Sequence, residues 1–419
     1  TTLAATLYIA NAPTEGTNQT ITAAWALYIA SGDMRSEGNV QFAGSIRTDA
    51  TMEVAGTAEF SGGVYGADTD ENPIINGAMD IWQRGTAFAA AATASYSADR
   101  WKIDFVTAAV VTINRSTSVP TVAEGVNLTL MVPLFNYSLE VDVTTVEAAI
   151  AATDVFVVSQ PIEGFNWRHF AQRPFALSFW VYATKTGTHC VSFTNSGNDR
   201  SYVATYTVSA SNTWEQKHVN VTASPSAGTW DYATGVGVQA RFCLMAGSNF
   251  QTTAGTWQTG NFTATSAQVN DLDDTANVFR ITGVKFEPIS GTTTPFKYRS
   301  FGTELALCKR YYQKSFIYTT APATSAGNTQ AEVLISSTTG AVTNGLQRGL
   351  GIAMRAAGTA TSYNPGAGNA QVRNTTDSAD DASTTVGSTE RNISVNFVAN
   401  AGNAVGEAHQ IHWSTTAEL

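Results

Sequence analysis

The sequence predicts an all-β protein with a short β-rich N-terminal shaft, a central jelly-roll-like β-sandwich and a small C-terminal β tip domain. Charged residues make up only 13% of the 419 residues, against roughly 25% in an average soluble protein. Solvent-exposed helices need charged residues along one face, so few are expected. Many short segments instead alternate apolar and polar residues with period two, and Gly, Asn and Ser separate them as in tight turns.

Residues 1–71 are predicted to form a β-rich oligomerising shaft or attachment region. The tetrapeptide LYIA at residues 7–10 recurs at residues 27–30, and glycines follow every few residues. One such segment cannot bury its apolar face alone, whereas copies from sister chains can cover it. We therefore expect the chain to associate with itself; a small monomeric sheet that packs on the next domain is the alternative.

Residues 72–302 are predicted to form the jelly-roll-like β-sandwich. Turn sequences separate short alternating segments, an arrangement typical of sandwiches and jelly rolls. In one segment, Leu177, Phe179 and Val181 share a face. The expected strands are residues 176–182, 201–208, 217–221, 235–244 and 278–286.

Two short stretches have helix-forming residues, 146–152 and 303–312. The second is predicted to be a short helical linker, because Lys309 and Arg310 stand near its end, where the helix dipole favours cations. Residues 313–419 are then expected to form the C-terminal tip domain, with strands at residues 330–335 and 393–397. Its long polar loops are candidates for recognition, since binding residues often lie on loops of a rigid scaffold.

Charge and cysteine content exclude several classes of partner. The net charge is −10 and the 23 basic residues are scattered, so a nucleic-acid partner is not expected. The chain shows no signal peptide and no apolar run of about 18 residues, so membrane insertion is not expected either. Three widely spaced cysteines, Cys190, Cys243 and Cys308, are expected to be buried free thiols.

No catalytic constellation is found, so the chain is predicted not to be an enzyme and to need no cofactor. The close pair His409 and His412 has the wrong spacing to share a metal on a strand and is interpreted as surface or tip-loop histidines. The acidic run 270–274 is the one weak metal candidate. It would hold Ca²⁺, which prefers oxygen ligands, although a solvated turn is the alternative; its carboxylates are Asp271, Asp273 and Asp274.

Carbohydrate binding is the functional alternative that the strands themselves offer. Trp180 and Tyr182 share one face of their strand, and Gln239 and Arg241 share one face of another. If the two strands are neighbours, these four residues would form an aromatic and polar patch. The competing interpretation is an interface with a sister chain or with the core of the second sheet.

The sequence NPIINGAMDIWQRGT at residues 72–86, followed by YSADRW at residues 96–101, resembles a module of tail fibres and other virion appendage proteins of tailed bacteriophages. The segments 177–181, 283–287 and 305–312 fit the same module. The resemblance implies a homotrimer in the virion, made in the host cytoplasm. It also implies that the sandwich, residues 72–302, is similar to a carbohydrate-binding module. The N-terminal region of the chain would contact other tail or baseplate proteins, and its distal parts would bind a host cell-surface glycan or protein receptor.

Within these motifs, Trp82, Arg84, Asp99, Arg100 and Trp101 are interpreted as structural. A buried Asp–Arg pair between two tryptophans would fix the entry to the sandwich, whereas a pair of ligand-contacting tryptophans is the alternative. The function that we expect is therefore adsorption to a host surface by a virion fibre or appendage. A carbohydrate-binding module without a fibre role, and a glycan depolymerase, are the alternative functions.

Overall fold

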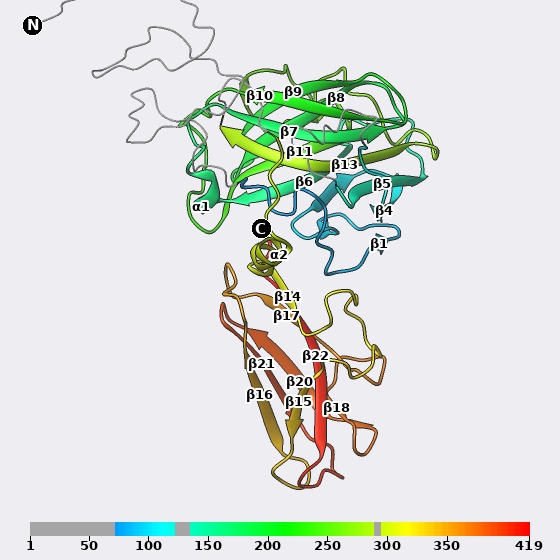
Figure 1. Cartoon of the computed structure of the whole chain (residues 1–419), viewed down its shortest axis with the longest axis vertical. Coiled ribbons are helices and arrows are strands. Elements are labelled where there is room, and N and C mark those ends of the chain that lie inside the picture. The colour runs from blue at the N-terminus through cyan, green and yellow to red at the C-terminus, as the bar shows by residue number, and fades with distance from the viewer. Residues whose placement is uncertain (1–71, 122–134, 289–294) are drawn as a thin grey trace, which may run out of the picture. The chain divides into compact units, whose positions relative to one another are not determined.

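The computed structural model describes residues 72–121, 135–288 and 295–419 (Figure 1). These residues belong to one compact unit, Tyr65–Leu419. Strands dominate the described residues and the helices are short, which confirms the predicted all-β fold class. These helices are also too short and too polar to traverse a lipid bilayer. The predicted shaft, residues 1–71, lies outside the described residues, so that prediction stays a prediction.

Two antiparallel sheets form the sandwich (Figure 1). In the first sheet the strand order is β1 (Ala87–Phe88), β4 (Val110–Ser116), β5 (Ser138–Thr145), β13 (Val278–Pro288), β7 (Phe175–Ala183) and β10 (Thr213–Val221). In the second sheet the order is β12 (Trp257–Thr259), β9 (Arg200–Val208), β8 (Gly187–Asn195), β11 (Val236–Ala246), β6 (Val155–Glu163), β3 (Lys102–Val106) and β2 (Ser95–Tyr96).

The core of the sandwich lies between the sheets and follows the period-two alternation of the strands. Leu177, Phe179 and Val181 of β7 are completely buried. The Phe179 ring meets Tyr206 of β9 and Phe242 of β11 edge-on, with centroids 5.0 and 4.9 Å apart. Burial of one large apolar side chain contributes about 1.5–3 kcal/mol, so this interdigitation fixes which face of each strand points inward.

The outer face of the second sheet is covered by the segment that contains the 3₁₀ helix Ser248–Phe250. Cys190 of β8 and Cys243 of β11 pack there with Ala264. All three cysteines are buried and free, as predicted. A short helix, α1 (Gly164–Trp167), follows β6 and was not predicted.

Helix α2 (Phe301–Lys309) follows the sandwich, close to the predicted linker at residues 303–312. Ser300 caps it, because the Ser300 side chain accepts a hydrogen bond from the Thr303 N–H. The other predicted helix, residues 146–152, is wrong: these residues form a loop. The Glu147 carboxylate there accepts a hydrogen bond from the Ala108 N–H, and a seven-residue helix without tertiary support is unstable in water.

The C-terminal strands form two sheets that surround a small apolar core of Val372, Val395, Phe397 and Ile411. Strand β22 (Ala408–Thr416) is central in the larger sheet, where it pairs with β14 (Tyr312–Lys314), β15 (Glu332–Ile335), β17 (Thr359–Tyr363) and β18 (Arg373–Asn374). The short β19 (Ala379–Asp380) pairs with β18. The smaller sheet has the order β16 (Thr343–Gly349), β21 (Asn392–Val398) and β20 (Ala382–Ser388).

The interpretation of His409 and His412 as surface or tip-loop residues is wrong, because each is only 1% exposed. The Nδ1 atom of His409 lies 2.5 Å from a carboxylate oxygen of Asp381, and its Nε2 lies 2.9 Å from Oδ1 of Asn403. His412 instead contacts Ser315 through Nδ1. Strand β22 is covered on both faces, and so both histidines lie within the domain.

Candidate binding pocket

The first motif, residues 72–86, begins with a loop that is attached to β13 by the side chain of Asn72. Its Oδ1 accepts hydrogen bonds from the Ile74 and Phe286 N–H groups, at 3.1 and 2.9 Å. Its Nδ2 donates to the Val284 carbonyl at 2.9 Å. An asparagine side chain carries both a donor and an acceptor, and here both are used to hold the loop on the edge of the sandwich.

Asn76 organises the interior of the same loop. It adopts a positive φ of 58°, a conformation that Asn tolerates better than most residues. Its side chain donates to the Ile81 and Asp99 carbonyls at 2.9 and 3.1 Å and accepts from the Ile81 N–H at 2.8 Å. The indole of Trp101 donates to the Asn76 carbonyl at 3.0 Å. The two sequence motifs are therefore joined through one asparagine.

Gly77 allows the loop to approach β13 closely. The Val284 N–H donates to the Gly77 carbonyl at 2.9 Å. A Cβ atom at Gly77 would overlap the Val284 carbonyl oxygen, so no larger residue fits without a shift of the backbone. The contact fixes the position of the next residues, including Asp80, whose own carbonyl accepts a hydrogen bond from the Tyr318 hydroxyl at 3.0 Å.

Residues 295–300, directly before α2, are held against this loop by Arg299. Its guanidinium lies 3.1 and 3.0 Å from the two carboxylate oxygens of Glu304 in α2, and it also donates to the Asn72 carbonyl. Glu304 in turn accepts a hydrogen bond from the Asn76 N–H. Charge-assisted contacts of this kind are stronger than neutral hydrogen bonds, so both walls of the space between loop and segment are fixed.

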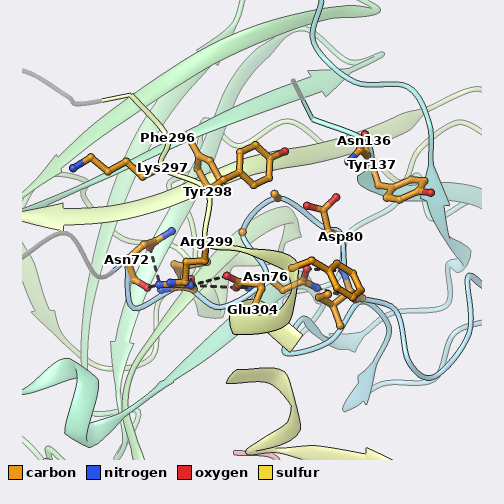
Figure 2. A pocket seen from close by; sticks show the side chains of 15 residues that line it. Asn72, Asn76, Asp80, Asn136, Tyr137, Phe296, Lys297, Tyr298, Arg299 and Glu304 are labelled. Carbon is orange, nitrogen blue, oxygen red and sulfur yellow. Dashed lines mark hydrogen bonds and ion pairs between the residues drawn. The ribbon is translucent and has the colours of Figure 1, made fainter. Parts of the chain in front are cut away.

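A cavity of about 290 Å³ lies between the loop and this segment (Figure 2). Aromatic side chains and hydrogen-bonding groups both face it, which is the usual composition of a site for a small polar ligand. The lining consists of Asn72, Ile74, Asn76, Gly77, Ala78, Asp80, Ile81, Asn136, Tyr137, Phe296, Lys297, Tyr298, Arg299, Phe301 and Glu304.

Asp80 is the polar group of this pocket with the least complete set of partners. In Figure 2 its carboxylate lies between Tyr298 and Asn136. Its Oδ1 atom is buried and has no hydrogen-bond partner among the described residues. Burial raises the pKa of Asp80, a hydrogen bond with Asn136 lowers it, and the charge of Glu304 raises it. Burial, together with the Asp80 charge, raises the pKa of Tyr298 well above its usual range.

The four residues predicted to bind carbohydrate do not form one patch. Trp180 and Tyr182 lie on β7 in the first sheet, whereas Gln239 and Arg241 lie on β11 in the second. Strand β7 pairs with β10 and β13, and β11 pairs with β6 and β8, so the assumption that the two strands are neighbours is wrong.

Each half of that prediction has a structural explanation. Trp180 is 4% exposed and belongs to an apolar cluster against which Phe296 of the pocket packs. Tyr182 lies under the Arg280 guanidinium at 4.5 Å. Arg241 donates to Asn261 and to the Phe262 carbonyl at 2.7 and 2.9 Å, and thus anchors the segment that covers the second sheet.

The motif residues Asp99 and Arg100 are buried and Arg84 is half-buried, but Asp99 and Arg100 do not pair with each other as expected. Asp99 instead accepts hydrogen bonds from Gln83 and lies 3.5 Å from Arg84. Arg100 pairs with Glu418, which follows β22, and stacks over the Tyr311 ring at 3.6 Å.

The two motif tryptophans are interior residues. Trp82 and Trp101 are 2% and 0% exposed. Their indole N–H groups donate to the Met79 and Asn76 carbonyls at 2.6 and 3.0 Å. Both tryptophans therefore stabilise the loop of the first motif from the protein interior, which agrees with the structural interpretation.

The weak calcium candidate is not supported by the positions of its carboxylates. Asp271 faces His189 at 3.1 Å in the interior, Asp273 pairs with Lys185, and Asp274 accepts from the Ala276 N–H at 2.9 Å. Throughout the described ranges, no group of three or more His, Cys, Asp or Glu side chains is placed to hold a metal ion.

The pocket was not predicted as a site from the sequence, although part of its lining lies in a motif that the sequence shows. Asp80 stands inside the first motif, residues 72–86. The available signal was the run FKYR at residues 296–299, in which aromatic and basic residues alternate directly before a helix. Alternation places the two aromatic rings on one side of an extended segment.

Comparisons with known proteins find no matching family model and no matching curated protein sequence. Among solved structures, the enzymatically active domain of tailspike protein 4 of bacteriophage CBA120 aligns with a TM-score of 0.27 at 14% identity, over 48% of this chain and 21% of that one. The alignment thus spans about a fifth of the tailspike chain.

Two carbohydrate-binding modules of Clostridium thermocellum align over most of their own length. The family 11 module of the cellulase Lic26A-Cel5E gives a TM-score of 0.26 at 10% identity, over 48% of this chain and 95% of the module. The C-terminal family 22 module of Xyn10B gives 0.25 at 13% identity, over 50% and 98%.

Proposed function

We propose that this chain is a structural protein of a tailed-phage virion appendage, and that it mediates adsorption by binding a host cell-surface glycan in the pocket. The observation that carries the proposal is the lining of that pocket. Tyr137, Phe296 and Tyr298 present aromatic surface beside the side chains of Asp80 and Asn136. Pyranose rings have apolar C–H faces and equatorial hydroxyls, and so they match apolar walls with a few convergent polar groups.

The arrangement favours binding over catalysis. Hydrolysis of a glycosidic bond generally needs two carboxyl groups that face each other across the substrate. Of the carboxylates that line the pocket, Glu304 is engaged by Arg299 at 3.0 Å and by the Asn76 N–H. Only Asp80 remains available there. We therefore keep the prediction that the chain is not an enzyme, and release of oligosaccharides from a host polysaccharide would overturn it.

The assignment to a virion appendage rests on the motifs at residues 72–86 and 96–101. Their residues form the pocket loop and its support, so the resemblance and the proposed site concern the same part of the molecule. A carbohydrate-binding module without a fibre role is the second candidate. Immunogold labelling of intact particles separates the two, because labelled tails support the appendage and unlabelled particles contradict it.

Self-association as a homotrimer is part of the proposal. Strand β15 exposes two aliphatic side chains, Val333 and Ile335, at 45% and 58%. Apolar strand residues that remain exposed in one chain are candidates for contact with a sister chain. Sedimentation equilibrium of the full chain should give about three times the 44.3 kDa of one copy, and a stable monomer would contradict the trimer.

Binding is tested with two tyrosine variants of equal exposure. Tyr298 lines the pocket and Tyr232 does not, and each is 40% exposed. Loss of an aromatic anchor should weaken binding to host cells, and to their purified surface polysaccharide, roughly tenfold or more. Tyr298→Ala should show this loss, whereas Tyr232→Ala should bind like the wild type. Equal binding by all three proteins would refute the pocket as the glycan site.

A further inference from the structure

Asp80 places an incompletely satisfied carboxylate inside the pocket, and this feature bears on the kind of sugar that fits. The chain direction around it is fixed by the positive φ of Met79, 59°, and by the hydrogen bond from the Tyr318 hydroxyl to the Asp80 carbonyl. The Asp80 side chain lines the cavity, and its Oδ1 atom is buried without a hydrogen-bond partner among the described residues. A buried acceptor without a partner is unusual in a folded protein.

No basic side chain among the described residues forms an ion pair with the Asp80 carboxylate. Glu304 carries a second negative charge nearby, but Arg299 pairs with it at 3.0 Å. Lys297 also lines the pocket, yet Figure 2 shows its amino group on the side of the view away from Asp80. Tyr298 beside Asp80 supplies a neutral ring and hydroxyl, since burial and the Asp80 charge raise its pKa.

We infer that the pocket selects an amino sugar with a free, protonated amino group, which Asp80 binds; this inference rests on the proposed glycan function. An ammonium group donates a charge-assisted hydrogen bond to the carboxylate, and such bonds are roughly twice as strong as neutral ones. The neighbouring rings of Tyr298 and Tyr137 add to the attraction, because aromatic faces favour cations. A neutral hydroxyl in the same place would donate a hydrogen bond to the Asp80 carboxylate but would leave its negative charge without a counter-charge.

The nature of the ligand follows from the size of the cavity. A space of about 290 Å³ accommodates one pyranose ring together with its substituents, so a terminal or branching hexosamine fits better than a long chain. An N-acetyl group would remove the positive charge, and it would place a carbonyl acceptor near a carboxylate that offers no donor. The inference therefore distinguishes free amino sugars from their acetylated forms.

The test compares glucosamine, N-acetylglucosamine and glucose by NMR titration of the full chain. The wild type should bind glucosamine about tenfold more tightly than glucose. In Asp80→Asn the ratio of the two affinities should fall to about one. The matched control Asp274→Asn changes an exposed aspartate outside the pocket and should keep the wild-type ratio.

A second measurement needs no variant. Burial raises the pKa of Asp80 above its ordinary value, and protonation of the carboxylate removes the ion pair. The preference for glucosamine should therefore decline as the solution is acidified toward this raised pKa, because the sugar amine stays charged in acid while the carboxylate becomes neutral. Equal binding of glucosamine and glucose by the wild type would overturn the inference and leave the proposed glycan function standing. If no sugar and no host polysaccharide binds, the proposed function fails, and the inference fails with it.

Discussion

Glu418 joins the first two sequence motifs to the C-terminal strands, and its replacement by glutamine should destabilise the chain strongly. Its carboxylate contacts Arg84 at 2.9 Å and also pairs with Arg100. The Arg100 side chain is 1% exposed and that of Glu418 is 7% exposed. Arg84 retains Asp99 at 3.5 Å after the change, but Arg100 keeps only the Pro161 carbonyl and the Tyr311 ring among its described contacts.

The expected loss follows from the burial of the orphaned cation. Removal of one partner of a buried ion pair costs about 3–5 kcal/mol, because the remaining charge has already lost its hydration. Since Arg84 keeps a second carboxylate, we expect the lower end of that range, about 3 kcal/mol. For a unit of about 350 residues a loss of that magnitude lowers the melting temperature by roughly 4 °C.

Urea and thermal unfolding, followed by tryptophan fluorescence, measure the effect. Glu390→Gln is the matched control, because Glu390 is exposed and a surface change of this kind stays within about 0.5 kcal/mol. The double variant Arg100→Met with Glu418→Met should be more stable than Glu418→Gln, since an apolar pair leaves no buried charge. The reasoning is refuted if Glu418→Gln unfolds like the control, or if the double variant is the less stable one.

Three further predictions concern the loop, the sandwich core and the C-terminal domain. Gly77→Ala forces a Cβ atom onto the Val284 carbonyl, so both the melting temperature and glycan binding should fall. Burial lowers the pKa of His189, but the neighbouring Asp271 raises it more, so the net pKa lies above the ordinary value. The unfolding free energy should therefore decrease as the pH rises through and above about 6.5. His189→Gln should reduce this pH dependence in urea titrations. His409→Ala should cost about 3 kcal/mol or more in the same assay, because it strands a buried carboxylate, and a loss below 1 kcal/mol would contradict the described contacts.

The strands of the sandwich could be predicted from the sequence because their signal is local. In β7 the inward residues Leu177, Phe179 and Val181 alternate with outward ones, and burial of one face requires this pattern wherever the strand is placed. Burial of the cysteines could be predicted for a similar reason, since Cys is one of the residue types most often buried.

The site could not be predicted in the same way, because it depends on which strands become neighbours. Trp180 and Arg241 both stand in segments that the sequence predicts as strands, but these strands lie in different sheets. The partner of Arg100 stands 318 positions away, and no local pattern points to it. His409 and His412 of β22 were wrongly predicted to lie at the surface, because the alternation of residues in a strand does not reveal whether both of its faces are covered.

Within the first motif, the residues that shape the pocket loop differ from the residue that is proposed to bind the ligand. The side chains of Asn72 and Asn76 hold the loop backbone through hydrogen bonds, and Gly77 allows its close approach to β13 because it has no side chain. These three residues determine the shape of the loop, and their hydrogen-bonding groups are already used within the protein. The groups that face the cavity come from Asp80 and from segments outside the motif, residues 136–137 and 296–298. Proteins that share the motif should therefore share the scaffold of the pocket and the Asp80 carboxylate, while the remainder of their sugar preference should change with the residues at those two segments.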